Sequence, residues 1–236
     1  MRVIKLSMKV ELVNYTLNPV ETIEKAASNC YNNQNNVGTG KIMKHCIKQG
    51  HMSVTEFAQF HFHIEGISRA CSHQLVRHRT ASFAQRSQRY VNEDMFEYVT
   101  PNSITENEDV LKMYDDIMAR IAWFYKFARH NNIPSEDARF MLPNACETVI
   151  DVSFDLRNLM HFMNERLCTN AQWEIRKLAI QMRKCVIEVA PELKDFLVPK
   201  CEINSDFPMC NEGNRCCGRH KTINEIKNKI GDIENA

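Results

Sequence analysis

The sequence predicts an α+β protein in which mixed helices pack on an antiparallel sheet within one large domain. Short segments whose apolar residues alternate predict strands, and longer segments with helical spacing outnumber them. No long linker, repeat or low-complexity tract separates these segments. With 236 residues, 44% of them hydrophobic, the chain can bury a full core. We therefore expect one domain over residues 1–197, followed by a cysteine-rich, charged tail over residues 198–236.

Strands are predicted over residues 9–16, 57–67 and 146–154. In the second segment every other residue from Ala58 to Ile64 is apolar, so this set is expected to face the core. His61 and His63 lie two residues apart on the opposite face. They fit an ordinary exposed strand face better than the edge of a metal site.

Helices are predicted over seven segments: residues 19–32, 40–50, 68–76, 106–131, 135–142, 155–167 and 171–190. Pro19 suits a helix start, and Gly50 suits a left-handed C-cap. Ser53 and Glu56 form the S-x-x-E pattern of a capping box. Trp173 is expected in the core.

The helix over residues 155–167 is predicted to be amphipathic. Its apolar side chains (Leu156, Leu159, Met160 and Met163) lie largely on one face, and Arg157, His161 and Asn164 share another. A solvated polar stripe and a ligand-binding face would both give this pattern.

Charge and composition exclude several classes of partner. The formal net charge is only +1, so no global field attracts nucleic acid or membrane. The N-terminal segment has no uninterrupted apolar run and predicts neither a signal peptide nor a membrane span. We expect a cytoplasmic protein whose scattered cysteines are reduced and mostly buried. These are Cys30, Cys46, Cys71, Cys146, Cys168 and Cys185.

Residues 77–90, RHRTASFAQRSQRY, hold four arginines, and residues 66–92 contain no Asp or Glu at all. Guanidinium groups bind phosphate or carboxylate oxygens in pairs, so an anion should complete this segment. A solvated basic face is the alternative, although apolar residues between the charges argue against it. Neighbouring Ser and Gln side chains suit a compact nucleotide. If residues 87–91 are extended, Ser87 and Arg89 point to the same side and grip one phosphate.

The segment fits the pattern R-H-R-x-x-S-x-x-x-x-S-x-R, with Arg77, His78, Arg79, Ser82, Ser87 and Arg89 at the specified positions. It resembles the signature of flavin-dependent thymidylate synthases. GHMSVTEF, SEDARFMLP, DLRNLMHFMNER and AQWEIR resemble further blocks of that family, so the resemblance covers residues 1–197 in order.

The resemblance implies a methyltransferase of dTMP and nucleotide biosynthesis. Members convert dUMP to dTMP, take the methylene group from methylenetetrahydrofolate, and take the hydride from FAD that NADPH has reduced. They are homotetramers whose active sites form where several subunits meet. Small-molecule substrates, rather than nucleic acid or membrane, are therefore the expected partners.

The resemblance also implies roles for individual residues. The dUMP-binding positions are Gln74, Arg77, Gln85, Arg86, Ser87, Gln88, Arg89, Arg139 and Arg166, of which Arg77, Ser87 and Arg166 are also implied in catalysis. The FAD-binding positions are Ser53, His78, Arg79, Thr80, Gln85, Asp155, Arg157 and His161. His51 aligns with a residue near the flavin and folate. The family often has an acid at the position of Gln85, and it can have asparagine at those of Asp155 and His161.

Several alternatives stay open. Arg139 has a possible ion-pair partner in Glu136, one turn away. The tail holds Cys201, Cys210, Cys216 and Cys217 with His220 nearby, enough ligands for tetrahedral zinc, but it lacks a C-x-x-C pair. Free thiols or a disordered tail are therefore expected there, and no metal is expected in the functional site.

Two other functions compete with the synthase. One is a non-catalytic nucleotide- or RNA-binding regulator with a zinc-binding cysteine tail, which would need no flavin. The other is a flavin reductase that has lost folate chemistry. No proline is followed by cysteine, the pattern of the nucleophile in flavin-free thymidylate synthases. We therefore expect no cysteine nucleophile, and we expect Ser87 to bind rather than attack.

Overall fold

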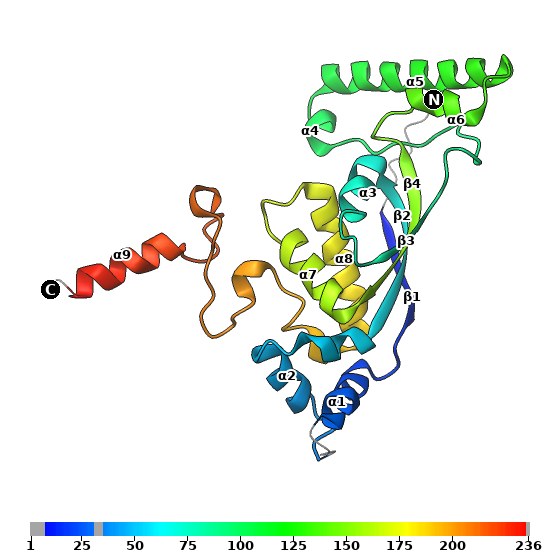
Figure 1. Cartoon of the computed structure of the whole chain (residues 1–236). Helices are drawn as coiled ribbons and strands as arrows, with labels where there is room; N and C mark the ends of the chain where they lie inside the picture. The colour runs from blue at the N-terminus through cyan, green and yellow to red at the C-terminus, as the bar shows by residue number, and fades with distance from the viewer. Residues whose placement is uncertain (1–7, 31–34, 235–236) are drawn as a thin grey trace. The chain divides into compact units, whose positions relative to one another are not determined.

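The computed structural model describes residues 8–30 and 35–234 and confirms the predicted α+β class (Figure 1). One sheet has the strand order β1-β2-β4-β3. Its strands are β1 Lys9–Tyr15, β2 Gln59–Ser68, β3 Ser82–Gln85 and β4 Glu147–Asp155. The Leu156 N–H donates to the Ala58 carbonyl, and the Arg69 N–H donates to the Cys146 carbonyl. Because these bonds join opposite ends of β2 and β4, the two strands are antiparallel.

All seven predicted helices are present. They are α1 Pro19–Asn29, α2 Lys41–Lys48, α3 Arg69–Leu75, α5 Glu108–His130, α6 Ser135–Ala138, α7 Leu156–Arg166 and α8 Trp173–Val189. Gly50 adopts a φ of 76°, as predicted for a left-handed residue after α2. Positions 31 and 32 of the predicted first helix lie outside the described residues. Among the described residues, no helix has the length and apolar character that a membrane span requires.

One strand and two α-helices were missed by the sequence patterns. Strand β3 has only four residues, and α4, Asn102–Thr105, is equally short. Elements of this length give too few periods for a pattern to be distinguished from a loop. The third, helix α9, Ile223–Glu234, lies in the tail, where free thiols or disorder was expected.

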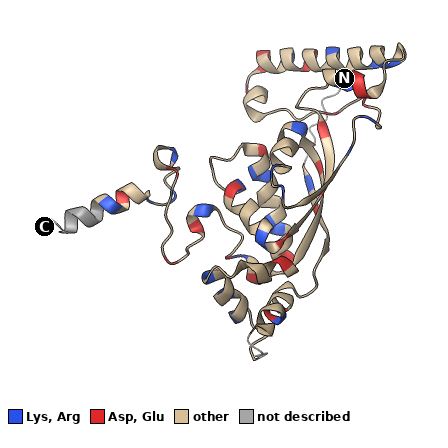
Figure 2. Cartoon of the chain, viewed as in Figure 1, with Lys and Arg blue, Asp and Glu red and all other residues tan. Residues whose placement is uncertain are grey.

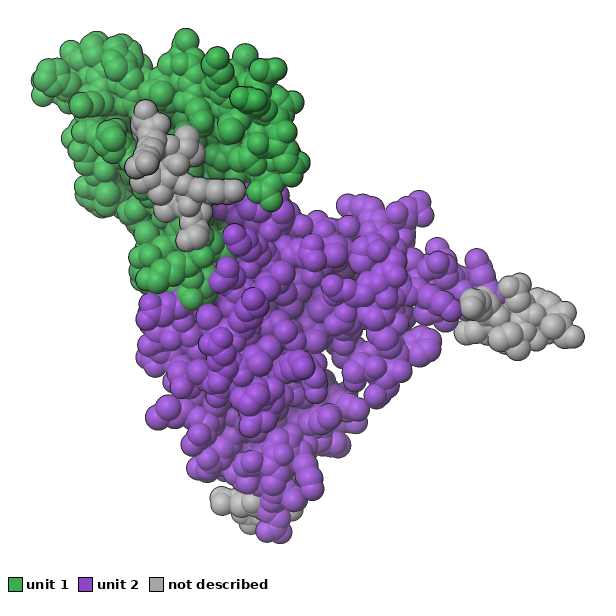
Figure 3. Space-filling model, turned by 180° about the vertical axis from the view of Figure 1, so that it is seen from behind, with its two compact units in different colours: residues 1–10, 63–77, 83–152 green, residues 11–62, 78–82, 153–236 purple. Residues whose placement is uncertain are grey.

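The chain divides into two compact units (Figure 3). Unit 1 comprises residues 1–10, 63–77 and 83–152, and unit 2 comprises residues 11–62, 78–82 and 153–236. Strands β2 and β4 each contribute residues to both units. The alternating residues of β2 from Ala58 to Ile64 are fully buried, as predicted. In unit 2 the rings of Phe154 and Phe162 lie 5.4 Å apart, so α7 packs against the end of β4.

The buried face of α7 is the predicted one, with Leu156, Leu159, Met160 and Met163 in the core. One core prediction is wrong. Trp173 is 43% exposed because it occupies the first turn of α8, where Ile175 and Leu178 face inward instead. Of the six cysteines that were expected to be mostly buried, three are buried, two are half-buried and one is exposed: Cys46, Cys71 and Cys146, then Cys168 and Cys185, then Cys30.

The predicted capping box at Ser53 and Glu56 is absent. These residues lie in a short 3₁₀ helix, η1 Met52–Phe57, whose N-cap is His51 without a side-chain cap. The Glu56 carboxylate instead accepts a 2.6 Å bond from Arg157. A tight 3₁₀ turn and this competing cation remove the geometry that a capping box needs.

Residues 87–91 form a turn and are not extended. The Tyr90 and Val91 N–H groups both donate to the Ser87 carbonyl, at 3.3 and 3.0 Å. The turn itself keeps the two predicted phosphate ligands together, because the Arg89 N–H donates to the Ser87 hydroxyl at 3.2 Å. Their proximity is therefore produced by a turn and not by strand alternation.

The buried carboxylate of Glu147 gives a test of the fold of unit 1. This side chain is 6% exposed and accepts bonds from the Gly66 N–H at 3.0 Å and from Arg86 Nη2 at 2.5 Å. Glu147→Gln should lower the free energy of unfolding by about 2–4 kcal/mol, because Arg86 keeps its charge and loses its main partner. Urea unfolding measures this loss. Glu21→Gln, in an exposed pair with Lys25, should cost under about 0.5 kcal/mol, and equal losses would contradict the assignment.

Candidate functional site

The predicted ligand residues separate by unit. Every predicted dUMP residue except Arg166 belongs to unit 1, and every predicted FAD residue except Gln85 belongs to unit 2. Arg77 and His78 are consecutive, so the chain passes from one set to the other within the R-H-R motif.

Gln74 and Arg77 lie at the end of α3. Ser68 begins this helix by accepting the Cys71 N–H at 3.0 Å, a standard N-cap. The helix ends at Leu75, and Arg77 follows with an exposed side chain. Across residues 8–30 and 35–234, Arg77 and Arg79 form no ion pair. Two exposed cations thus remain available to an anion.

Gln85 is held by two donor bonds. Its amide nitrogen donates to the Ser72 hydroxyl at 2.8 Å and to the Thr148 hydroxyl at 3.2 Å. Both amide hydrogens are therefore used within unit 1, and the carbonyl oxygen is the remaining polar group of this side chain.

Arg86 and Gln88 are engaged within the fold. Arg86 binds the buried Glu147 carboxylate and lies 3.7 Å from Glu93. Gln88 is buried and donates to the Cys146 thiol at 3.5 Å. A ligand was expected to neutralise the whole arginine segment. For Arg86 this expectation is wrong, because the carboxylates of Glu93 and Glu147, from outside the segment, lie beside its guanidinium.

Arg89 and Arg139 meet at Glu136. Arg89 Nη2 lies 3.2 Å from the Glu136 carboxylate, while Arg139 Nε donates to the Glu136 backbone carbonyl at 3.2 Å. The suggested ion pair of Arg139 with Glu136 is thus replaced by a bond to its carbonyl group. Half-exposed pairs of this kind contribute only about 0–1 kcal/mol, so an incoming phosphate can compete for both guanidinium groups.

In unit 2, His78 is 8% exposed and accepts a bond from Arg166 Nε at 3.1 Å. The rings of His161 and Phe162 lie 5.8 and 5.0 Å from its ring. Burial, together with the charges of Arg166 and His161, lowers the pKa of His78 to about 4. His78 is therefore a neutral acceptor at neutral pH, and it fixes the orientation of the Arg166 guanidinium.

Asp155 is the N-cap of α7. It accepts the Asn158 N–H at 2.8 Å and the Asn158 side-chain amide at 2.6 Å. Asn158 in turn accepts a 2.6 Å bond from the Thr80 hydroxyl. The predicted FAD residues Thr80 and Asp155 are therefore linked through a residue that the sequence did not single out. The sequence offered a signal for it, since Asp155 precedes the apolar face of a helix.

The remaining predicted FAD residues lie on or near η1 and α7, which pack against each other. Arg157 and His161 are exposed on the polar face of α7, and Arg157 is paired with Glu56. His51 and Ser53 are exposed at the start of η1. Nearby on the same face of α7, the buried Oδ1 of Asn164 has no hydrogen-bond partner among the described residues.

Charged residues are distributed differently along α5 and along residues 66–92. Figure 2 shows acidic and basic residues interspersed along α5, whereas residues 66–92 carry only basic ones. His63 lies outside this segment, and its ring nitrogens bind Asp151 at 2.9 Å and Glu65 at 3.2 Å. His63 is thus half-buried and bonded to two carboxylates, whereas an ordinary exposed strand face was expected.

The chain matches known proteins over most of its length. A family model described as thymidylate synthase complementing protein matches residues 11–192. The chain is 39% identical over 233 residues to a flavin-dependent thymidylate synthase of Geobacter sulfurreducens, covering 93% of this chain and 97% of that relative. It is 37% identical over 246 residues to one of Clostridium tetani, covering 94% and 97%. A relative from Pyrococcus furiosus is 42% identical over 188 residues, covering 74% and 77%.

The fold is α+β, and its described residues include exposed arginines without carboxylate partners. The matches are specific, and they show that the chain belongs to the family of flavin-dependent thymidylate synthases. The predicted family, the enzyme class and the flavin cofactor are confirmed. An enzyme family also favours the catalytic prediction over a non-catalytic regulator.

The lowered pKa of His78 predicts how stability depends on pH. The unfolded chain protonates this histidine near pH 6.5, while the folded chain does so near pH 4. Since the unfolded state binds more protons between these values, the free energy of unfolding should fall as the pH drops from about 6.5 to about 4. His78 should account for about 2–3 kcal/mol of the loss at pH 4.5, at 1.36 kcal/mol per pKa unit.

Urea unfolding at pH 7 and pH 4.5 measures this effect. His78→Gln keeps a hydrogen-bond acceptor and should lose less stability on acidification than the unmodified chain. His73→Gln, at an exposed position of α3, is the control and should follow the unmodified chain. An unchanged pH dependence in His78→Gln would show that the imidazole is not the group that titrates.

Proposed function

We propose that this chain converts dUMP to dTMP with methylenetetrahydrofolate as the carbon donor and with FAD that NADPH reduces. The observation that carries the proposal is the pair of exposed motif arginines, Arg77 and Arg79, which form no ion pair across the described ranges. Family membership supports the reaction and the flavin. The folate and the NADPH rest on the family resemblance of the motif. The same resemblance supports a cytoplasmic location, which we also propose.

The dUMP-binding residues have separate tasks in this proposal. Arg77, Arg89 and Arg139 bind the phosphate. Within the described chain Arg77 has no carboxylate partner. Arg89 and Arg139 have only exposed contacts with Glu136, which a phosphate can displace. Ser87 adds its hydroxyl at the turn. Gln74 and the Gln85 carbonyl oxygen orient the pyrimidine, whereas Arg86 and Gln88 keep the segment in place.

Arg166 is the residue proposed to polarise the pyrimidine. Its Nε is used by His78, so the two Nη groups remain to bind an oxygen that gains negative charge during the reaction. His78 supports this role because a neutral imidazole accepts the bond without adding a second positive charge. His78 is thus a positioning residue for Arg166 as well as a proposed flavin contact.

The residues of unit 2 fit a flavin dinucleotide in their chemistry. Arg79 and Arg157 match the charge of a pyrophosphate, and Thr80 and Ser53 supply hydroxyl groups. His161 and the unpartnered Asn164 oxygen supply polar contacts on α7. When bound, the flavin supplies the hydride of the reaction. To bind the pyrophosphate of the flavin, Arg157 must break its ion pair with Glu56.

The cysteines support a reaction without a thiol nucleophile. Burial raises the pKa of Cys146, the cysteine closest in sequence to β4, to about 12. A thiol of this kind is not ionised at neutral pH and is not available for attack. Cys46 and Cys71 are buried as well. The proposed reaction therefore involves no covalent enzyme–cysteine adduct, and Ser87 serves binding.

The assembly is proposed to be a homotetramer, and α5 offers a surface for it. Large apolar side chains are exposed at helical spacing along one stripe: Val110, Met113, Ile117, Phe124 and Phe127. An exposed apolar stripe on a long helix is typical of a subunit interface. Light scattering of the active protein should give four chains per particle, and a stable, fully active monomer would refute the assembly.

The reaction is tested by assaying dTMP formation. Purified protein with dUMP, methylenetetrahydrofolate, NADPH and FAD should form dTMP, and omission of any one component should stop the reaction. NADPH oxidation without dTMP would identify a flavin reductase, and a protein that binds no flavin would contradict the proposal. Cys168→Ala should retain activity, since Cys168 lies outside the motif positions.

The arginines at Glu136 give a quantitative prediction. Arg89→Ala and Arg139→Ala should each weaken dUMP binding by about 2–4 kcal/mol, or roughly 30- to 1,000-fold in Kd, because each removes a charge-assisted bond. Calorimetric titration with dUMP measures the loss, and thermal unfolding should stay nearly unchanged. Arg120→Ala, in an exposed pair with Asp116 on α5, is the control. Unaltered dUMP affinity in both test variants would exclude the role.

A further inference from the structure

The segment over residues 200–222 has too small an apolar core to account for its fold. Its helices are three-residue turns, η4 Lys200–Glu202 and η5 Gly213–Arg215. Cys210 is its only buried residue, while Ile203 and Phe207 are exposed. Segments of this kind are usually held by disulfides or a metal.

The segment nevertheless makes specific contacts within unit 2. The Met209 N–H donates to the Cys201 carbonyl at 3.1 Å, and the Cys210 N–H donates to the Lys221 carbonyl at 2.9 Å. These bonds place Cys201 and Cys210 on adjoining stretches, with His220 next to Lys221. The fold of the segment therefore gathers residues that ligate metals.

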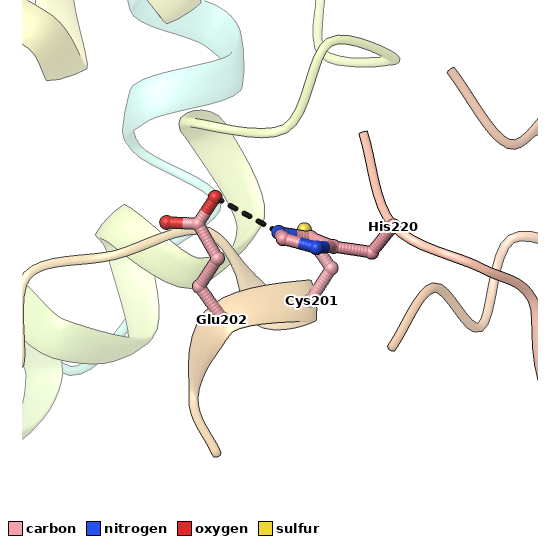
Figure 4. Close-up of side chains that lie close together, drawn as sticks. All are labelled: Cys201, Glu202 and His220. Atoms are coloured by element: carbon pink, nitrogen blue, oxygen red, sulfur yellow. Dashed lines mark hydrogen bonds and ion pairs between the residues drawn. The ribbon is translucent and has the colours of Figure 1, made fainter. Parts of the chain in front are cut away.

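Two pairs of candidate ligands lie close together. Figure 4 shows Cys201 and His220, whose ligand atoms lie within 4.8 Å of each other and of a Glu202 oxygen. The thiols of Cys210 and Cys216 interact with each other and therefore form the second pair. Cys210 also lines the same pocket as Cys201.

Backbone amides point at two of the sulfur atoms. The Glu212 N–H hydrogen-bonds the Cys210 sulfur, and the Gly218 N–H donates to the Cys216 sulfur at 3.4 Å. Each amide lies two residues after its cysteine. Gly218 permits its turn with a φ of 81°. Both sulfur atoms therefore accept a backbone hydrogen bond of the kind that surrounds metal-bound cysteines.

We propose that Cys201, Cys210, Cys216 and His220 bind one structural zinc ion. Three thiolates and one imidazole form a Cys₃His set, and four such ligands match the tetrahedral preference of zinc. Nothing in the catalytic reaction requires this ion. The proposal replaces the sequence-based expectation of free thiols or a disordered tail.

The surroundings supply the outer contacts of such a site. His220 Nε2 lies 3.3 Å from the Glu202 carboxylate, an arrangement that leaves Nδ1 to the metal. Three thiolates leave one negative charge on a zinc centre. Arg219 lies 3.2 Å from Glu202, and Lys200 is paired with Glu212, so basic groups border the cluster.

The proposed ion would secure η4 on the helix that carries predicted flavin residues. η4 packs against α7, and Asn170, just beyond α7, donates to the Arg215 carbonyl at 3.0 Å. Loss of the ion should therefore expose the tail to protease first and leave the sheet intact.

Metal analysis of the full-length protein tests the proposal. Protein purified without chelator and dialysed should hold one zinc per chain by mass spectrometry. Cys201→Ser, Cys210→Ser, Cys216→Ser and His220→Asn should each lower zinc content at least tenfold at equal protein concentration. Cys217→Ser is the matched control, because Cys217 is adjacent to Cys216 but its side chain is exposed. That variant should keep its zinc.

Two outcomes overturn the proposal. One is a reduced chain without zinc that also fails to take up added Zn²⁺. The other is a Cys210–Cys216 disulfide found by peptide mapping. If a variant folds poorly, Co²⁺ substitution of the unmodified chain gives an independent test. Tetrahedral thiolate coordination should then produce intense charge-transfer and d–d absorption, and a spectrum without these bands contradicts the ligand set.

Discussion

Neutralisation of the arginine segment by distant carboxylates is the constraint on which the rest of the structure depends. Glu147 is buried beside Arg86 and closes an ion pair that joins β4 to the residues after β3. Glu136 takes Arg89 at the surface. Across the described ranges Arg77 and Arg79 receive no carboxylate, so the fold itself separates structural arginines from those that are available to a ligand.

In unit 2 an arginine, Arg166, is held by a neutral histidine, His78, instead of a carboxylate. A protonated imidazole beside Arg166 would place two positive charges 3.1 Å apart in a buried position. Burial instead keeps His78 neutral, which lets Arg166 hold a fixed orientation without an acidic partner. Arg166 therefore retains its full positive charge toward a ligand. Electrostatic preorganisation of this kind is the main contribution a protein makes when a cofactor carries the hydride.

Long periodic elements were predictable from the sequence, and contacts between distant residues were not. The buried face of β2 follows directly from its alternation, and the buried face of α7 follows from its apolar spacing. Strand β3 was missed because four residues show no clear period. The burial of Trp173 was predicted wrongly. Apolar spacing shows which residues of α8 share a face, but it does not show whether the first residue of the helix is covered by other elements.

The candidate site shows the same division. The motif located Arg77, His78, Arg79, Ser87 and Arg89 without any knowledge of the fold. It did not reveal that Glu147 neutralises Arg86, or that Glu56 neutralises Arg157, because these partners lie 61 and 101 residues away. The tail gave a similar result. Its sequence contains no C-x-x-C pair and so did not predict a metal site, whereas the folded segment brings Cys210 and Cys216 together.

We propose that Arg77, an arginine without a carboxylate partner in the described ranges, is a main ligand of the nucleotide phosphate. Calorimetric titration of the flavin-loaded protein with dUMP and with deoxyuridine, which lacks the phosphate, measures this contribution. We expect dUMP to bind at least about 100-fold more tightly, near 2.7 kcal/mol, and Arg77→Gln to remove most of this preference. Equal affinity for the two ligands, or a preference that Arg77→Gln leaves intact, would exclude this role of Arg77.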